Sequence, residues 1–99
     1  MAWRIYVAPV SRRGELEESL KDDVLWRQTR ILRDAGPLGG AADEIYLYME
    51  GSESAMGRAD TLLGPIAAKV DPARAEELHA RFKAEEEMSA QGMGLMFSD

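Results

Sequence analysis

The chain contains a run of carboxylates of the kind that binds divalent cations. Glu85, Glu86 and Glu87 follow one another, with His79 shortly before them and Asp99 at the end of the sequence. Calcium and magnesium prefer such oxygen ligands. Three consecutive helical residues, however, point over about 200° around the helix axis and cannot all reach one ion. We therefore predict a solvated helix face, and keep a calcium or magnesium site at Glu85, Glu86 and His79 as an alternative.

A second candidate is the turn formed by Gly51 and Ser52, which lies between a strand pattern and a helix pattern. Such a turn offers free backbone N–H groups to an anion. It lacks the glycine spacing of the nucleotide-binding motifs and the lysine that follows in one of them. The neighbouring Glu50 and Glu53 would also repel phosphate. We predict that Ser52 caps the following helix, and keep an anion site at Gly51 and Ser52 as the alternative.

Nucleophilic and redox chemistry have few residues to use in this chain. There is no cysteine, which excludes disulfides, thiolate metal sites and a cysteine nucleophile. His79 is the only histidine, and no motif places a nucleophile beside it for general-base catalysis. We therefore expect a non-enzymatic protein without a cofactor, and keep a small enzyme of unknown reaction as a further alternative.

Two segments alternate between apolar and polar residues, as half-buried strands do. In the first, residues 3–10, Pro9 is expected to end the strand or to mark a sheet edge because proline lacks the backbone donor. The second runs over residues 44–50. One face of each strand is expected to be covered by helices, namely Trp3, Ile5 and Val7 in the first strand and Ile45, Leu47 and Met49 in the second.

The opposite faces of these two strands carry aromatic and charged residues of the kinds that protein interfaces enrich. If both strands bury their apolar faces, all three tyrosines and one arginine point the same way. The candidate interface residues are Arg4, Tyr6, Tyr46, Tyr48 and Glu50. We predict that this face meets a partner, and the alternative is that the chain's own terminal segment covers it.

Three helices are predicted between and after the strands. The first spans residues 15–35, where acidic residues precede basic ones and so complement the helix dipole. The second follows Ser52 and ends before Gly64, and the third begins after Asp71 and runs to about residue 90. Residues 66–70 are expected to form a short strand, and Gly94–Phe97 a last edge strand.

Composition favours one acidic globular domain. The 99 residues carry a formal net charge of −6. Phosphate contacts dominate nucleic-acid binding and anionic membranes repel an acidic surface, so neither a nucleic acid nor a membrane is an expected partner. We expect a single domain over residues 1–99 and, because no signal segment is recognisable, a cytoplasmic location.

The predicted element order is β-α-β-α-(β)-α-β, which indicates a small two-layer α/β sandwich. The nearest common arrangement is ferredoxin-like, with an extra helix. Helices between consecutive strands predict parallel neighbours unless the sheet order skips a position. For function we expect a binding or regulatory domain, or a small subunit, that forms a homodimer or binds another protein through the tyrosine-bearing face or an edge strand. A small-molecule ligand is left open.

Overall fold

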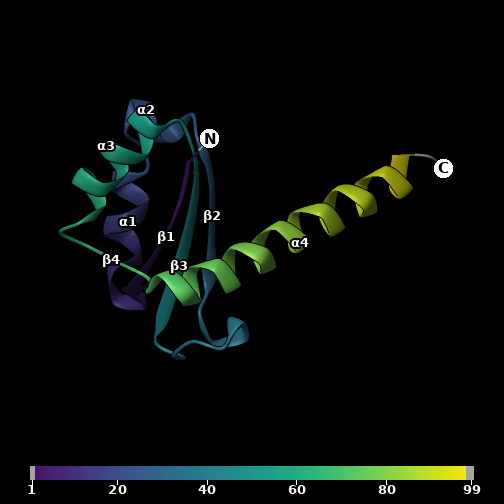
Figure 1. Cartoon of the computed structure of the whole chain (residues 1–99), viewed down its shortest axis with the longest axis horizontal. Helices are drawn as coiled ribbons and strands as arrows, with labels where there is room; N and C mark the ends of the chain where they lie inside the picture. Colours follow the sequence, from purple (N-terminus) through teal and green to yellow (C-terminus); the bar gives the residue numbers. More distant parts are fainter. Residues whose placement is uncertain (1, 98–99) are drawn as a thin grey trace.

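The computed structural model describes the backbone of residues 2–97 and the side chains of residues 2–85. Strands and helices alternate along the chain (Figure 1). The strands are β1 (Ala2–Pro9), β2 (Thr29–Asp34), β3 (Glu44–Gly51) and β4 (Ala68–Lys69). The α-helices are α1 (Arg13–Ser19), α2 (Asp23–Trp26), α3 (Glu53–Leu63) and α4 (Pro72–Phe97), with the short 3-10 helices η1 (Val10–Arg12) and η2 (Gly36–Leu38).

The strands form one sheet in the order β2-β3-β1-β4. The central pair, β1 and β3, is matched along its whole length, from Ala2 opposite Gly51 to Pro9 opposite Glu44. β2 pairs with the other edge of β3, and β4 adds a short segment to β1. All neighbours are antiparallel. The predicted parallel pairing of the two alternating strands, β1 and β3, is wrong because the unpredicted strand β2 lies between them in the chain and the chain reverses direction after it. The α/β class is confirmed.

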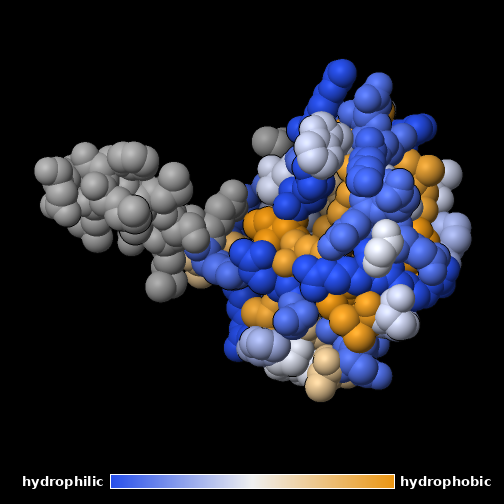
Figure 2. Space-filling view, turned by 180° about the vertical axis from the view of Figure 1, so that it is seen from behind, coloured by the Kyte–Doolittle hydropathy of each residue, from blue (hydrophilic) through white to orange (hydrophobic). Residues whose placement is uncertain are grey.

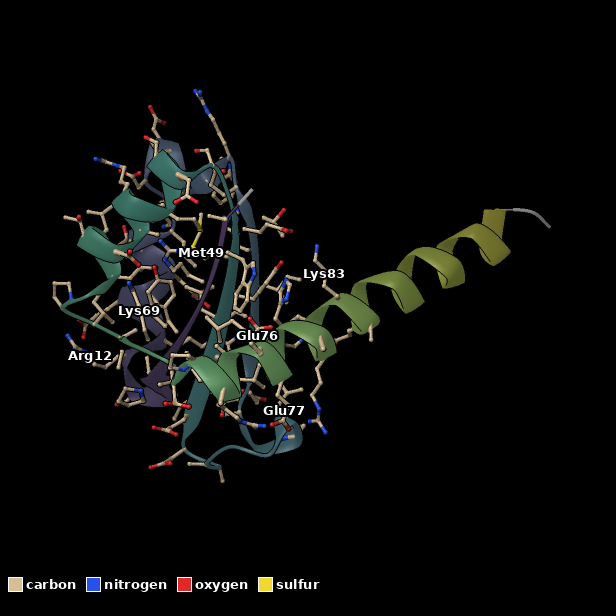
Figure 3. The ribbon with its side chains drawn as sticks, in the orientation of Figure 1. Arg12, Met49, Lys69, Glu76, Glu77 and Lys83 are labelled. Atoms are coloured by element: carbon tan, nitrogen blue, oxygen red, sulfur yellow. The ribbon has the colours of Figure 1, made fainter. Side chains whose placement is uncertain are left out.

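The helices α1, α2 and α3 lie together on one face of the sheet (Figure 1). Their apolar side chains pack on Ile45, Leu47 and Met49 of β3, which are almost completely buried. Figure 3 shows Met49 between the strands and this helix layer. The prediction that helices cover this face of β3 is therefore confirmed.

The helix α4 covers the opposite face of the sheet. Its residues Leu78 and Phe82 pack with Tyr46 and Tyr48, and each of these four side chains is at most 5 % exposed. Beyond the sheet, α4 continues as a projecting helix (Figure 1). Within residues 2–97, no helix combines the length and the apolar composition needed to cross a bilayer.

The three tyrosines do not share one face of the sheet. Cross-strand partners lie on the same face of an antiparallel pair, and Tyr6 is opposite Leu47 whereas Ile5 is opposite Tyr48. Tyr6 therefore points towards α1–α3, while Tyr46 and Tyr48 point towards α4. The predicted face assignment of β1 is wrong because it assumed that the apolar positions of β1 and β3 coincide.

The predicted long helix over residues 15–35 is also wrong, since α1, α2 and β2 take its place. Asp22 interrupts the helix because its carboxylate accepts hydrogen bonds from the backbone N–H groups of Val24 and Leu25 and so caps a new helix, α2. The following residues pair with the free edge of β3. The β-branched side chains of Thr29 and Ile31 suit this extended conformation.

The other element predictions are confirmed except at the C-terminus. β3, α3 and a short β4 within residues 66–70 follow the predicted pattern. α4 begins after Asp71, whose carboxylate accepts a hydrogen bond from the backbone N–H of Ala73 at 3.2 Å. The predicted edge strand at Gly94–Phe97 is wrong, because α4 continues through these residues.

Replacing Leu47 with alanine tests the packing of β3 against α1–α3. Leu47 is 1 % exposed, so L47A should lower the free energy of unfolding by about 2–5 kcal/mol, the usual cost of truncating a buried leucine. Urea unfolding followed by circular dichroism measures this change. The matched control Ser54→Ala lies on the exposed side of α3 and should change the free energy by less than about 0.5 kcal/mol. Equal stability of L47A and S54A would contradict the packing described.

Candidate functional site

Hydrophobic residues reach the molecular surface in patches between charged side chains (Figure 2). Among the described side chains, the large hydrophobic ones exposed by more than a third are Val10, Val24 and Trp26. Trp26 is the most exposed of these, at 58 %. It also lines a pocket, so this tryptophan marks the best candidate for a binding site within the described part of the chain.

The pocket lies at the edge of the sheet between α1, α2 and β2, with a volume of about 360 Å³. Its apolar lining comes from Leu20, which follows α1, from Leu32 of β2 and from Leu47 of β3, with Trp26 contributed by α2. The volume is at the lower end of the range for small-molecule sites, about 300–1,000 Å³. The space therefore suits a small ligand with an apolar body.

Charged side chains surround this apolar surface. Arg13, Lys21 and Arg30 line the pocket together with one carboxylate, that of Glu17. Arg13 is paired with Glu17 at 3.1 Å, and Lys21 is paired with Glu18 at 3.2 Å. The lining thus holds three cations and one carboxylate, although the whole chain has a net charge of −6.

Arg30 differs from the other two cations in its surroundings. Its guanidinium carbon lies 4.0 Å from the centroid of the Trp26 ring, which is a cation–π contact. Its Nε atom is buried and has no hydrogen-bond acceptor. Among the described side chains, no carboxylate forms an ion pair with Arg30. Leaving a buried donor without an acceptor costs about 1–3 kcal/mol, so this guanidinium has unused hydrogen-bonding capacity beside the pocket.

The turn that positions Trp26 is fixed by Asp22. Besides capping α2, its carboxylate accepts two hydrogen bonds from the guanidinium of Arg58 on α3, at 2.6 and 2.8 Å. These hydrogen bonds lower the pKa of Asp22 to about 2. Because one carboxylate both starts α2 and ties it to α3, the short helix that ends in Trp26 has a defined place beside β2.

The predicted interface residues Arg4 and Tyr6 belong instead to a cluster around Asp60 of α3. The Tyr6 hydroxyl donates a hydrogen bond to Asp60 at 2.7 Å, and the side-chain nitrogens of Arg4 and Lys69 lie 3.4 and 3.1 Å from the same carboxylate. Burial and the bond to Asp60 raise the pKa of Tyr6. Partial burial opposes ionisation of Asp60, but the bonds from Tyr6 and Lys69 outweigh it, so the pKa of Asp60 lies below its usual value. The cluster joins β1, α3 and β4, and Lys69 is its residue from β4 (Figure 3).

The other predicted interface residues lie under or beside α4. Tyr46 and Tyr48 are buried, which matches the alternative in which the chain's own terminal segment covers this face. Burial and the neighbouring Glu50 raise the pKa of Tyr48 to about 12. Glu50 is paired with Lys83 of α4 at 2.9 Å, and this bond lowers the pKa of Glu50. The five predicted interface residues therefore lie on opposite faces of the sheet: two on the face that α1–α3 cover and three on the face that α4 covers.

His79 packs as an aromatic residue between α4 and the sheet. Its ring stacks on Trp3, with centroids 4.1 Å apart and an interplanar angle of 4°. The ring of Tyr48 lies 5.7 Å away. Its Nε2 atom is buried without a hydrogen-bond partner. This environment offers His79 an aromatic surface on which its ring stacks.

Of the predicted carboxylate site, Glu85 and His79 have described side chains. Glu85 is paired with Arg33 of β2 at 3.1 Å. The side chain of Glu86 and the whole of Asp99 lie outside the described residues. Among residues with described side chains, no group of three or more histidine, aspartate and glutamate side chains is arranged to hold a metal ion.

The turn at Gly51 and Ser52 acts as a helix cap, as predicted. The Ser52 hydroxyl accepts a hydrogen bond from the backbone N–H of Ala55 at 3.1 Å. Gly51 is buried, and a Cβ atom at this position would meet Oε1 of Gln28 at 2.0 Å. The side chain of Gln28 therefore fills the space beside this turn and would have to move if Gly51 were replaced by a larger residue.

Sequence reasoning did not identify Trp26 and Arg30. Both residues fell within the predicted helix over residues 15–35. An arginine on the solvent-facing side of a helix is common and does not indicate a binding site. The β-branched residues Thr29 and Ile31, two positions apart, are the signal that could have indicated a strand here. Once this strand is placed beside β3, Arg30 and Leu32 fall on the side of the sheet that faces α1 and α2.

Replacing Asp60 with asparagine tests the cluster of Arg4, Tyr6 and Lys69. The folded pKa of Asp60 is below its unfolded value of about 3.9, so its contribution to stability is present above that value and is lost as the pH falls through the folded pKa. D60N should be less stable at neutral pH by on the order of 1 kcal/mol, with a smaller difference at about pH 3. Urea unfolding at both pH values measures this, and a difference independent of pH would contradict it. Tyr6→Phe, which keeps the ring, should also lose stability at neutral pH.

Comparison of the chain with protein-family models, with curated proteins and with solved structures found no match.

Proposed function

We propose that this chain is a small non-enzymatic binding domain whose ligand site is the pocket between α1, α2 and β2. The observation that carries the proposal is the largely exposed Trp26 beside an apolar cavity of about 360 Å³. The same chain buries all three of its tyrosines. Tryptophan is enriched among the residues that dominate binding energies at interfaces. A ligand bound in this small apolar cavity would contact the Trp26 ring.

The position of the pocket on regular elements supports the proposal. Leu32 and Leu47 are direct cross-strand partners in the β2–β3 ladder, and Leu20 is only 6 % exposed. The apolar lining is therefore held in place before a ligand arrives. A preformed site loses less conformational entropy on binding than one that must be ordered.

The two alternatives predicted from the sequence have less support. A calcium or magnesium site would need Glu85, whose carboxylate is paired with Arg33. An enzyme based on His79 would use an imidazole that is stacked on Trp3. Neither residue lines the pocket.

We also propose that the arrangement is ferredoxin-like. The chain order β1, α1–α2, β2, β3, α3, β4 matches the β-α-β-β-α-β pattern, and the sheet order β2-β3-β1-β4 places the first and third strands in the centre. α4 is then the extra helix. Because such folds host many unrelated functions, the fold adds no weight to any one ligand.

Trp26→Ala tests the binding site with a neutral aromatic probe, phenylpropanamide, in an NMR titration. Chemical-shift changes should concentrate on the Trp26 indole N–H and on the backbone amides of Leu32 and Leu47. W26A should weaken binding about tenfold, because it removes the aromatic contact surface. The control Val10→Ala removes an apolar side chain that is 45 % exposed outside the pocket and should bind the probe as the wild type does. Shifts centred on α4, or equal affinity of W26A and the wild type, would refute the site.

Self-association through the edge of β2 is a second candidate function. β2 is an outer strand of the sheet. The backbone N–H of Ala35 donates to the carbonyl of Glu44 at 3.0 Å, which continues the ladder with β3. Since alternate residues of an antiparallel strand face each neighbour, Arg30, Leu32 and Asp34 turn their backbone groups towards the free edge. A second copy can add a strand to such an edge.

In one register of this pairing, residues of opposite charge in the two copies lie across from each other. If a two-fold axis passes through Leu32, then Arg30 of each copy lies opposite Asp34 of the other, and opposite charges across strands stabilise a sheet by roughly 0.2–1 kcal/mol per pair. Against this, the guanidinium of Arg33 donates to the outward carbonyl of Leu32 at 3.0 Å. A charged side chain on an edge protects it from pairing, and for this reason self-association ranks second.

Charge exchange at the β2 edge tests this second candidate by sedimentation equilibrium. If copies pair in this register, Asp34→Arg should weaken association about tenfold, because it places two arginines opposite each other. The double variant R30D/D34R exchanges the two charges and should restore association. A wild-type chain that keeps the mass of a monomer, 11.0 kDa, at millimolar concentration would rule out this function.

A further inference from the structure

We infer that the pocket binds a small aromatic monocarboxylate, with the guanidinium of Arg30 as the partner of the carboxylate. This inference rests on the proposed ligand site and names the chemical class of its ligand. It follows from the charges that line the pocket, from the one cation among them that has no partner, and from the apolar surface beside that cation.

The charge of the lining favours an anion. Three cations and one carboxylate line the pocket within a chain of net charge −6. Two of the cations, Arg13 and Lys21, already have carboxylate partners at 3.1 and 3.2 Å. Arg30 has none among the described side chains, and its Nε atom is buried. A partly buried cation is poorly solvated by water. An anionic ligand that accepts its hydrogen bonds therefore stabilises it more than it would stabilise a fully exposed cation.

A single carboxylate suits this site better than a phosphate. The planar guanidinium can donate two parallel hydrogen bonds to a carboxylate. Glu17 also lines the pocket, and its carboxylate is held there by Arg13 at 3.1 Å. A doubly charged phosphate would be repelled more strongly by Glu17 than a monoanion would. The lining therefore admits one negative charge next to Arg30.

The rest of the lining selects an apolar and flat body. Leu20, Leu32 and Leu47 form apolar walls, and Trp26 adds an aromatic surface that is 58 % exposed. Aromatic rings prefer offset or edge-on contacts with one another, worth about 0.5–1.5 kcal/mol beyond the area that they bury. A volume of about 360 Å³ limits the ligand to a small one, such as one aromatic ring with a short acidic side chain.

The observations favour a ligand over a second copy as the partner of Arg30. In the self-association register, Arg30 would pair with Asp34 of the other copy. The outward carbonyl of Leu32, at the centre of that register, is already bonded to Arg33 at 3.0 Å. α4 also continues past the sheet (Figure 1), and a second copy would have to fit beside it. A small molecule in the pocket meets neither obstacle.

Three probes with the same aromatic body and different charges test the inference. They are phenylpropanoate, the neutral phenylpropanamide and the cationic phenylpropylammonium, titrated by NMR against the monomeric chain. The carboxylate should bind at least about tenfold more tightly than the amide, and the ammonium should bind more weakly than both. Added salt should weaken binding of the carboxylate and leave the amide unchanged.

Two variants of Arg30 and one neighbouring control assign the effect to this guanidinium. Arg30→Gln should weaken binding of the carboxylate far more than binding of the amide, and should so remove the preference for the carboxylate. Arg30→Lys keeps the charge without the planar fork and should retain part of the preference. Arg27→Gln, which removes a charge just after α2 and outside the pocket lining, should bind all three probes as the wild type does. The NMR spectrum of each variant reports whether it is folded.

Each outcome of these titrations decides between the proposals. Equal binding of the carboxylate and the amide, with both weakened by Trp26→Ala, would overturn the carboxylate inference and leave the binding site standing. The same holds if R30Q keeps the full preference. If none of the three probes binds, both proposals fail. An effect of Arg30 seen only in sedimentation, and not in the titrations, would assign this guanidinium to self-association and overturn the inference.

Discussion

The pairing of β3 on both of its edges is the interaction on which the rest of the structure depends. β1 and β2 bond to its two edges, and helices cover both of its faces. Residues 45–49 are consequently at most 5 % exposed. Because the ladders bond the backbone of β3 on both sides, the strand can be buried with its backbone N–H and C=O groups paired. The register of the two ladders determines which side chains share a face of the sheet. Leu47 lies between Tyr6 and Leu32 on the face covered by α1–α3, whereas Tyr48 faces α4.

Local signals predicted a large part of this fold. The alternation in β3 predicted a strand whose odd positions meet helices. Ser52 predicted the start of α3 through its hydroxyl cap, and Asp71 predicted the start of α4 in the same way. These features are readable because the interacting groups are only two or three residues apart in the chain, so no knowledge of tertiary partners is needed.

The candidate site could not be predicted in this way, since it depends on contacts between distant segments. The helix predicted over residues 15–35 drew on charges that complement the helix dipole, and such interactions contribute only about 0.3–1 kcal/mol each. The ladder between β2 and β3 outweighs them, and only that ladder brings Leu32 next to Leu47. The faces of β1 were misassigned for the same reason. Alternation along one strand shows which of its residues share a face. Only the pairing of that strand with β3 determines which helices this face packs against.

The projection of α4 beyond the sheet changes how the molecule behaves in solution. The chain measures 46 × 30 × 26 Å and has a radius of gyration of 14.0 Å, against about 13 Å for a compact domain of about 100 residues. An elongated particle has more friction than a sphere of equal mass. A single copy should therefore elute early from a sizing column and resemble a heavier species, so mass and shape have to be measured separately before any assembly is assigned.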